Sequence, residues 1–222
     1  VNLSAFLTWY NQPGTPKLEA KGEYNADAQI YTLSLKQSLK AHAKYPNLKA
    51  VPMPVALALF DATTGEQLVL NSDSLFENGV KDGVYLFDQA EASIVFKNVT
   101  AQPVVSLLRN FSAPVDLEFN YSDQDLAFLL QHETNGFNQW QAAQTLLENI
   151  LLKDHNAQVY LDAISSPQLL PQLVKTDPLL ASRLLDVPSE GYLASRIDAD
   201  YNPLVIQAKR EALLNAVAQA CK

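Results

Sequence analysis

Cysteine and glycine are both scarce in this sequence. Cys221 is the only cysteine, and seven glycines are spread over 222 residues. One cysteine can form neither an internal disulfide nor a multi-thiol metal site, which favours a reducing, cytoplasmic location. So few glycines leave no glycine-rich loop of the kind that holds the phosphates of a nucleotide. We therefore predict that the chain binds no nucleotide cofactor.

Basic charge and long apolar runs are lacking as well. The sequence has 16 Lys and Arg against 24 Asp and Glu, which gives a net charge of -8. Such a chain is a poor match for a polyanion or an anionic membrane surface. No uninterrupted apolar run approaches the roughly 20 residues that a membrane-spanning helix needs. We expect neither nucleic acid nor a membrane as a partner.

No complete catalytic motif is present. The segment at residues 132–136, HETNG, begins like the His-Glu-x-x-His zinc helix, but Gly136 stands where the second histidine would bind the metal. This predicts that His132 and Glu133 form a solvent-facing pair on a helix. His42 and His155 lie in or next to polar loops and are expected at the surface. We predict no catalytic, cofactor-binding or metal-binding residue in this chain.

Two further patterns have structural explanations. Asp123 and Asp125 are not followed by the glycine and glutamate of a calcium loop, so they fit the acidic first turn of a helix better. Trp9, Tyr10 and Trp140 could stack on a ligand, but their helical spacing with other apolar residues favours core packing.

Strand patterns occupy most of the first half. A helix at residues 3–10 carries Leu3, Phe6, Leu7 and Tyr10 on one face, and the segment at 11–16, NQPGTP, ends it. A hairpin is expected from strands at 17–24 and 29–35. Further strands are expected at 55–60, 67–70, 84–87, 93–96, 104–108 and 115–121. About seven to nine short strands at this spacing predict an immunoglobulin-like antiparallel β-sandwich.

Helical periodicity replaces the strand pattern after residue 121. Ser122 is a suitable N-cap for a helix with Leu126, Leu129 and Leu130 in its apolar stripe, and we expect Gly136 to end that helix. The next helix is predicted to place one apolar stripe against its neighbours. The residues of that stripe are Phe137, Trp140, Ala143, Leu147 and Leu151.

Two later helices are expected to start at Asp177-Pro178 and Asn202-Pro203, where a capping side chain precedes proline. About four to six helices in all predict an α-helical array. The last of these carries an apolar face that we expect to be exposed, with self-association as a consequence. The residues of this face are Val205, Ala208, Ala212 and Ala216, widened by Ile206, Leu213 and Val217.

The sequence therefore predicts three parts. Residues 1–12 are expected to be the tail helix of a preceding domain, residues 13–121 the β-sandwich, and residues 122–222 the N-terminal part of a helical domain. The change from strand to helix periodicity follows the segment at 111–115, FSAPV.

Four stretches occur in the order found in a known enzyme family. They are WYNQPGTP at residues 9–16, FSAPV at 111–115, SDQ at 122–124 and WQAAQ at 140–144. On these residues the chain resembles the M1 family of zinc metalloaminopeptidases, and the resemblance runs along its whole length. It corresponds to the family's β-sandwich and to the beginning of its helical domain.

The resemblance implies a supporting role. In the M1 family the catalytic domain precedes the sandwich, and the helical domain closes over the active site. The Gly-x-Met-Glu-Asn loop, the His-Glu-x-x-His helix and the later zinc-binding glutamate of the family are absent here. The resemblance thus implies an inactive chain without zinc, with the sandwich as spacer and the helices as wall of the substrate chamber. The implied partners are the parent's catalytic domain, its remaining helices and its peptide substrates.

An alternative from another class is an extracellular immunoglobulin-like adhesion or carbohydrate-binding module with a helical stalk. Four Asn-x-Ser/Thr sequons, at Asn2, Asn98, Asn110 and Asn120, favour it. The lack of a disulfide and the helix at residues 3–10 oppose it.

Overall fold

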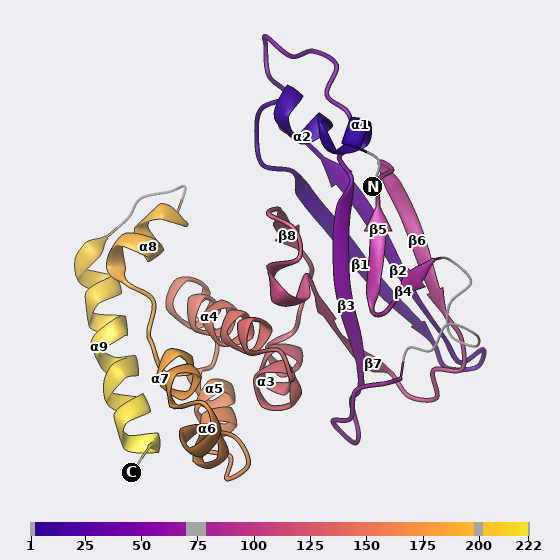
Figure 1. Cartoon of the computed structure of the whole chain (residues 1–222). Helices are drawn as coiled ribbons and strands as arrows, with labels where there is room; N and C mark the ends of the chain where they lie inside the picture. The colour runs from indigo at the N-terminus through magenta and orange to yellow at the C-terminus, as the bar shows by residue number, and fades with distance from the viewer. Residues whose placement is uncertain (1–2, 70–78, 198–201, 222) are drawn as a thin grey trace. The chain divides into compact units, whose positions relative to one another are not determined.

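The chain divides into two compact units, Val1–Asn120 and Tyr121–Lys222. The structure is a computed structural model that describes residues 3–69, 79–197 and 202–221. Figure 1 draws the first unit from indigo to magenta and the helices of the second from rose to yellow. Each unit is described by itself below.

The first unit opens with two short helices, α1 (Leu3–Phe6) and α2 (Thr8–Asn11), where the sequence predicts one helix at 3–10. The indole N–H of Trp9 donates to the carbonyl of Pro52 over 2.8 Å. Gln12 and Lys49 exchange two hydrogen bonds, of 2.7 and 2.9 Å. These contacts join Trp9 and Gln12, in the segment expected as the tail of another domain, to the loop before β3 (Met53–Asp61).

Two four-stranded sheets form the body of this unit. One has the order β6-β2-β1-β8 and the other β4-β5-β3-β7, and β1 with β8 is the parallel pair. The bounds are β1 (Lys17–Asn25), β2 (Ile30–Ser38), β3 (Met53–Asp61), β4 (Val80–Lys81), β5 (Val84–Phe87), β6 (Glu91–Phe96), β7 (Pro103–Leu107) and β8 (Asp116–Glu118). The prediction of an immunoglobulin-like sandwich is confirmed.

The inner faces of the strands follow the predicted alternation. On β2, Tyr31, Leu33 and Leu35 are buried, whereas Ser34 between them is exposed. The turn between β4 and β5 contains Asp82 and Gly83 with φ of 52° and 76°, as a tight hairpin turn requires. The strand predicted at 67–70 is reduced to one bridge between Phe60 and Gln67, and residue 70 lies outside the described residues.

All regular elements in the described part of the second unit are helices. They are α3 (Asp123–His132), α4 (Gly136–Lys153), α5 (Ala157–Ile164), α6 (Leu170–Thr176), α7 (Pro178–Leu184), α8 (Glu190–Ser195) and α9 (Pro203–Ala220). The described residues thus hold seven helices in this unit, more than predicted, because short helices such as α6 and α8 show no clear periodic pattern. None of the described helices is both long and apolar enough to cross a membrane.

Side-chain caps begin these helices where the sequence predicts them. The Ser122 hydroxyl accepts the N–H of Asp125, whose carboxylate accepts the N–H of Ser122, and this completes a capping box. The side chains of Asp177 and Asn202 cap α7 and α9 by accepting backbone N–H groups of the first turn. Gly136 is the exception, since it starts α4 behind the N-cap Asn135, while α3 has already ended at His132.

The core of the helical unit also departs from the prediction in two places. Ala143, Leu147 and Leu151 of the predicted α4 stripe are buried, but Phe137 and Trp140 are only half-buried. Helix α9 packs through Ile206, Leu213 and Val217, while Val205, Ala208 and Ala212 face solvent. The expected exposure is therefore confirmed for Val205, Ala208 and Ala212. It is wrong for Ile206, Leu213 and Val217, because α9 packs these residues against other helices of its unit.

Candidate functional site

The segment that begins like a zinc helix is a helix end. His132 is exposed and lies with its ring centroid 4.5 Å from that of Phe128, and partial burial lowers the pKa of its imidazole. Glu133 is 3% exposed and accepts the N–H of Asn135 over 2.7 Å. The prediction of a solvent-facing pair is wrong for Glu133, because a side chain at the end of a helix can fold back over the next turn. In the described ranges no group of three or more His, Cys, Asp or Glu side chains could hold a metal ion.

The other two histidines are exposed, as predicted, and His155 has a partner that the sequence did not suggest. Its Nδ1 lies 2.7 Å from a carboxylate oxygen of Asp123, at the first turn of α3. The amide of Asn149 also donates to Asp123, over 3.4 Å, and accepts from Lys153 over 2.9 Å. This cluster joins the start of α3 to the end of α4, which is a structural role.

An apolar surface lies on the first two helices. Leu3, Phe6, Leu7 and Tyr10 are between 46% and 75% exposed, and Phe6 and Tyr10 contact edge to face. We call these four residues the N-terminal apolar surface. Core packing was the wrong expectation for Tyr10, since periodicity placed these residues on one face without identifying what covers it.

Helix α9 carries a second apolar surface. Leu204 is 73% exposed and Val205 47%, and Ala208 and Ala212 continue the same side of the helix. We call these four residues the α9 apolar surface. On the opposite side, Arg210 donates to the carbonyl of Pro188 over 2.7 Å and fixes the helix to its unit.

The outer face of the β6-β2-β1-β8 sheet forms a polar hollow of about 950 Å³. Among the lining residues, Lys36 pairs with Glu91 at 3.0 Å and Glu118 pairs with Lys17, in each case between neighbouring strands. The Glu118 carboxylate raises the pKa of Lys17. Because each charge faces an opposite one on an exposed surface, the pairs offer a ligand little binding energy.

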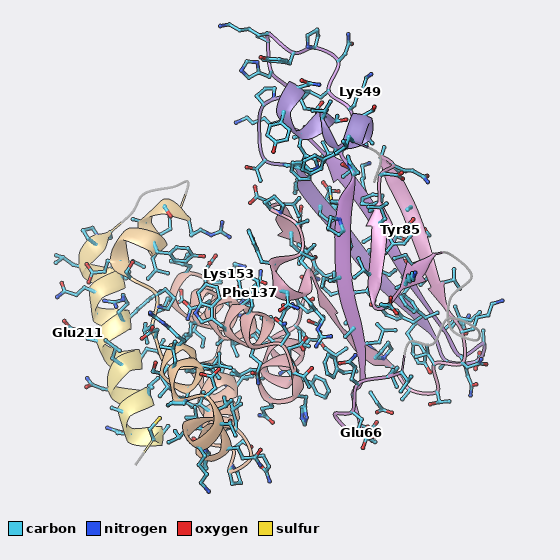
Figure 2. The ribbon with its side chains drawn as sticks, in the orientation of Figure 1. Lys49, Glu66, Tyr85, Phe137, Lys153 and Glu211 are labelled. Atoms are coloured by element: carbon cyan, nitrogen blue, oxygen red, sulfur yellow. The ribbon has the colours of Figure 1, made fainter. Side chains whose placement is uncertain are left out.

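The helical unit has a less polar groove of about 640 Å³. Helix α4 contributes Phe137, labelled in Figure 2, together with Trp140 and Gln144, and α7 contributes Leu180 and Arg183. The segment 186–189 and Tyr192 of α8 form the opposite wall. We call this feature the α4–α7 groove. Sequence reasoning missed it because its walls come from three helices and a turn.

Comparison with known proteins finds a matching family for each of the two units. Residues 14–120 match the family described as a domain of unknown function (DUF3458) with an Ig-like fold, and residues 123–222 match its companion DUF3458_C, described as ARM repeats. Aminopeptidase N of Escherichia coli is 36% identical over 98% of this chain. The chain belongs to the aminopeptidase N family. Aminopeptidase N of Caulobacter vibrioides is 31% identical, also over 98% of the chain.

The match covers only part of each relative. The chain spans about a quarter of the length of aminopeptidase N, 25% of the Escherichia coli protein and 24% of the Caulobacter one. Among solved structures, aminopeptidase A of Legionella pneumophila, crystallised with aspartic acid, superposes with a TM-score of 0.75 at 26% identity. That match covers 98% of this chain and 24% of the solved one. The resemblance seen in the sequence is therefore confirmed for an Ig-like domain followed by ARM-type helices.

Proposed function

We propose that this chain is a non-catalytic part of a zinc aminopeptidase of the M1 family, which removes N-terminal residues from peptides in the cytoplasm. The sandwich unit acts as a spacer next to the catalytic domain, and the helical unit acts as a wall of the substrate chamber. The observation that carries the proposal is the alignment with aminopeptidase N over 98% of this chain and a quarter of the relative.

The residues that the structure describes do not fit a catalytic zinc ion. His132 has no second imidazole one turn later, because Gly136 occupies that position, and Glu133 is buried at the end of α3. A zinc site needs at least three protein ligands with a position left open for water. We therefore assign the metal and the attack of water on the peptide bond to the rest of the longer protein.

Both apolar surfaces support a role inside a larger assembly. The N-terminal apolar surface and the α9 apolar surface leave large side chains in water, which isolated soluble domains avoid. Contact with the catalytic domain and with further helices of a longer protein would cover them. The partners proposed for this chain are therefore other parts of the same enzyme.

Activity of the purified chain tests the assignment. We expect no hydrolysis of an alanyl chromogenic amide and no bound zinc by atomic absorption after gel filtration. Aminopeptidase N of Escherichia coli, assayed at the same molar concentration, is the positive control. Hydrolysis that a chelator abolishes and added zinc restores would overturn the proposal.

A second candidate, the extracellular adhesion or carbohydrate-binding module, is favoured by one observation. The sequon residues Asn98, Asn110 and Asn120 are all exposed, while Asn2 lies outside the described residues. Glycans on these three residues of the native protein, found by mass spectrometry, would support this candidate over the peptidase. Unmodified asparagines are the result expected for a cytoplasmic protein.

A further inference from the structure

The α4–α7 groove is bounded by aromatic and aliphatic side chains held in fixed positions. The Phe137 and Trp140 rings lie 5.8 Å apart on α4, with Leu180 and Pro188 facing the same groove. Across the groove, the Tyr192 hydroxyl donates to Glu148 over 3.0 Å, which orients that ring. Aromatic walls of this kind bind apolar groups without costly rearrangement.

The turn on the far side of the groove is also anchored. The amide of Gln144 donates to the carbonyl of Asp186 over 2.8 Å. The guanidinium of Arg210, on α9, donates to the carbonyl of Pro188 over 2.7 Å. Both walls are thus joined by hydrogen bonds that do not depend on an occupant. The groove is a preformed site, as small-ligand and peptide sites usually are.

Trp140 lines the groove and has an indole N–H that can donate a hydrogen bond. The N–H of Trp9 is used by Pro52, but within the part of the chain that the structure describes the Trp140 N–H donates to no protein acceptor. The side chain is half-buried, so its N–H can serve an incoming carbonyl oxygen. Peptide carbonyls are the acceptors that aromatic-lined grooves bind in extended, proline-containing segments.

Charge selects against most other ligands. Arg183 and Asp186 line the groove as an ion pair of 2.9 Å, so the lining carries no net charge, and the chain as a whole carries -8. A neutral segment is the complement of a neutral lining, and an acidic one is repelled by the chain.

The length of the groove sets the length of the segment that it can bind. Phe137 and Gln144 are seven residues apart on α4, which corresponds to roughly 10 Å of helix. A polyproline II chain covers this distance with about three residues.

From this geometry we propose that the α4–α7 groove binds a segment of a partner polypeptide, about three residues long, extended, uncharged and rich in proline. The apolar rings of the segment lie on Trp140, Phe137 and Tyr192, and one of its carbonyl oxygens accepts the Trp140 N–H. The inference does not depend on the proposed peptidase role, because its evidence lies in this groove alone.

Titration of the ¹⁵N-labelled chain with acetyl-Pro-Leu-Pro-amide tests the proposal. The chain has two tryptophans, and Trp9→Phe assigns their indole N–H signals. We expect the Trp140 signal to shift saturably, with a dissociation constant of about 1 mM, and the Trp9 signal to stay in place. Acetyl-Glu-Gly-Glu-amide is the matched charged peptide and is expected to produce no shift.

Two variants report on the two parts of the site. Trp140→Phe keeps a ring but removes the indole N–H donor, and Tyr192→Ala removes an aromatic side chain from the opposite wall. We expect each variant to weaken peptide binding at least about fivefold. Shifts of the backbone amide signals measure this binding. Gln141→Ala, on the same helix but outside the lining, is the control and should bind normally. The proposal is overturned if the Trp140 signal is unchanged at 10 mM peptide, roughly ten times the expected constant, or if the acidic peptide shifts it equally.

Discussion

Gly22 has a packing role that its neighbours in the strand do not share. It lies on the inner face of β1, where a Cβ atom would come within 2.7 Å of the Tyr31 ring carbon that bears the hydroxyl, and closer still to the hydroxyl itself. Tyr31 is buried on β2, so its ring cannot move aside into solvent. The ring occupies the space that a side chain at position 22 would fill.

We expect Gly22→Ala to lower the free energy of unfolding by about 1–3 kcal/mol, because the extra methyl overpacks the inner face of the sheet. Urea unfolding followed by circular dichroism measures this. Gly191→Ala is the matched control, since nothing lies within 4 Å of its added Cβ on α8. The control should gain up to about 1 kcal/mol from helix propensity. A stable Gly22→Ala variant would contradict the packing role.

Tyr160 gives the helical unit a dependence on alkaline pH. Its hydroxyl is buried and donates to the carbonyl of Leu184 over 2.7 Å. Burial, with smaller contributions from Cys221 and Asp186, raises the pKa of this phenol well above its usual value of 10.0. A raised pKa in the folded state means that stability is complete below pH 10 and is lost as the pH rises further.

We therefore expect the unfolding free energy to fall as the pH rises above about 10, the pKa of an unperturbed phenol, and to fall less steeply in Tyr160→Phe. At pH 7 the same variant should be less stable by about 1–3 kcal/mol, because the buried Leu184 carbonyl loses its donor. Thermal melts of the parent chain and of Tyr160→Phe, at pH 7 and at pH values above about 10, give the measurement. Equal pH slopes for the two proteins would show that Tyr160 is not responsible.

At the scale of elements, the helices are defined mainly by their N-terminal caps. The capping box of Ser122 and Asp125 lies where strand periodicity ends, so the same two residues start α3 and stop the sheet pattern. Short helices such as α7 depend on the same device, since Asp177 precedes Pro178 and accepts the N–H of Leu180. A cap compensates for the few backbone hydrogen bonds within so short a helix.

We expect Ser122→Ala to cost about 1 kcal/mol of unfolding free energy, because the N–H of Asp125 loses its acceptor. Ser122→Thr keeps a hydroxyl at the same place and should retain most of the stability. Urea unfolding monitored at 222 nm, roughly the wavelength of helical ellipticity, compares the two. A loss of similar size in both variants would mean that the cap is not the cause.

At the scale of the whole molecule, apolar surface is the dominant feature that neither unit covers by itself. The α9 apolar surface leaves Leu204 and Val205 in water on a long helix. Two copies that pair through this surface would bury both residues. Self-association of the isolated chain follows from the same surface that we propose to dock within a longer enzyme.

We expect sedimentation velocity to show a concentration-dependent rise in mass, with Val205→Lys shifting the equilibrium toward monomer. Val174→Lys is the matched control, since Val174 is 61% exposed on α6 and is not part of the α9 apolar surface, and it should associate like the parent chain. A monomeric parent chain at all concentrations would exclude the α9 apolar surface as a contact site.

Much of the fold could be predicted from local signals. The alternation of Tyr31, Leu33 and Leu35, the turn at Asp82-Gly83 and the caps at Ser122, Asp177 and Asn202 each depend on residues a few positions apart. Gly136 was misassigned because glycine at either end of a helix is compatible with the sequence. The Asn135 cap, seen only in the structure, decides that it starts α4.

The functional surfaces could be predicted only in part. The stripe of Phe137 and Trp140 was expected to be core, but helical spacing shows which residues share a face and leaves the neighbouring element undefined. The groove forms because α7 and the turn at 186–189 approach that face without filling it. Contacts between segments some forty residues apart leave no local pattern in the sequence.

The sequence by itself determined the order of the two units, the helix caps and the incomplete zinc motif, because each is written in neighbouring residues. Only the tertiary structure decided that Glu133 and Ile206 are buried while Tyr10 is exposed. Burial depends on which segments meet, and that is set by the packing of the whole chain. The surfaces on which the proposed functions rest belong to this second class.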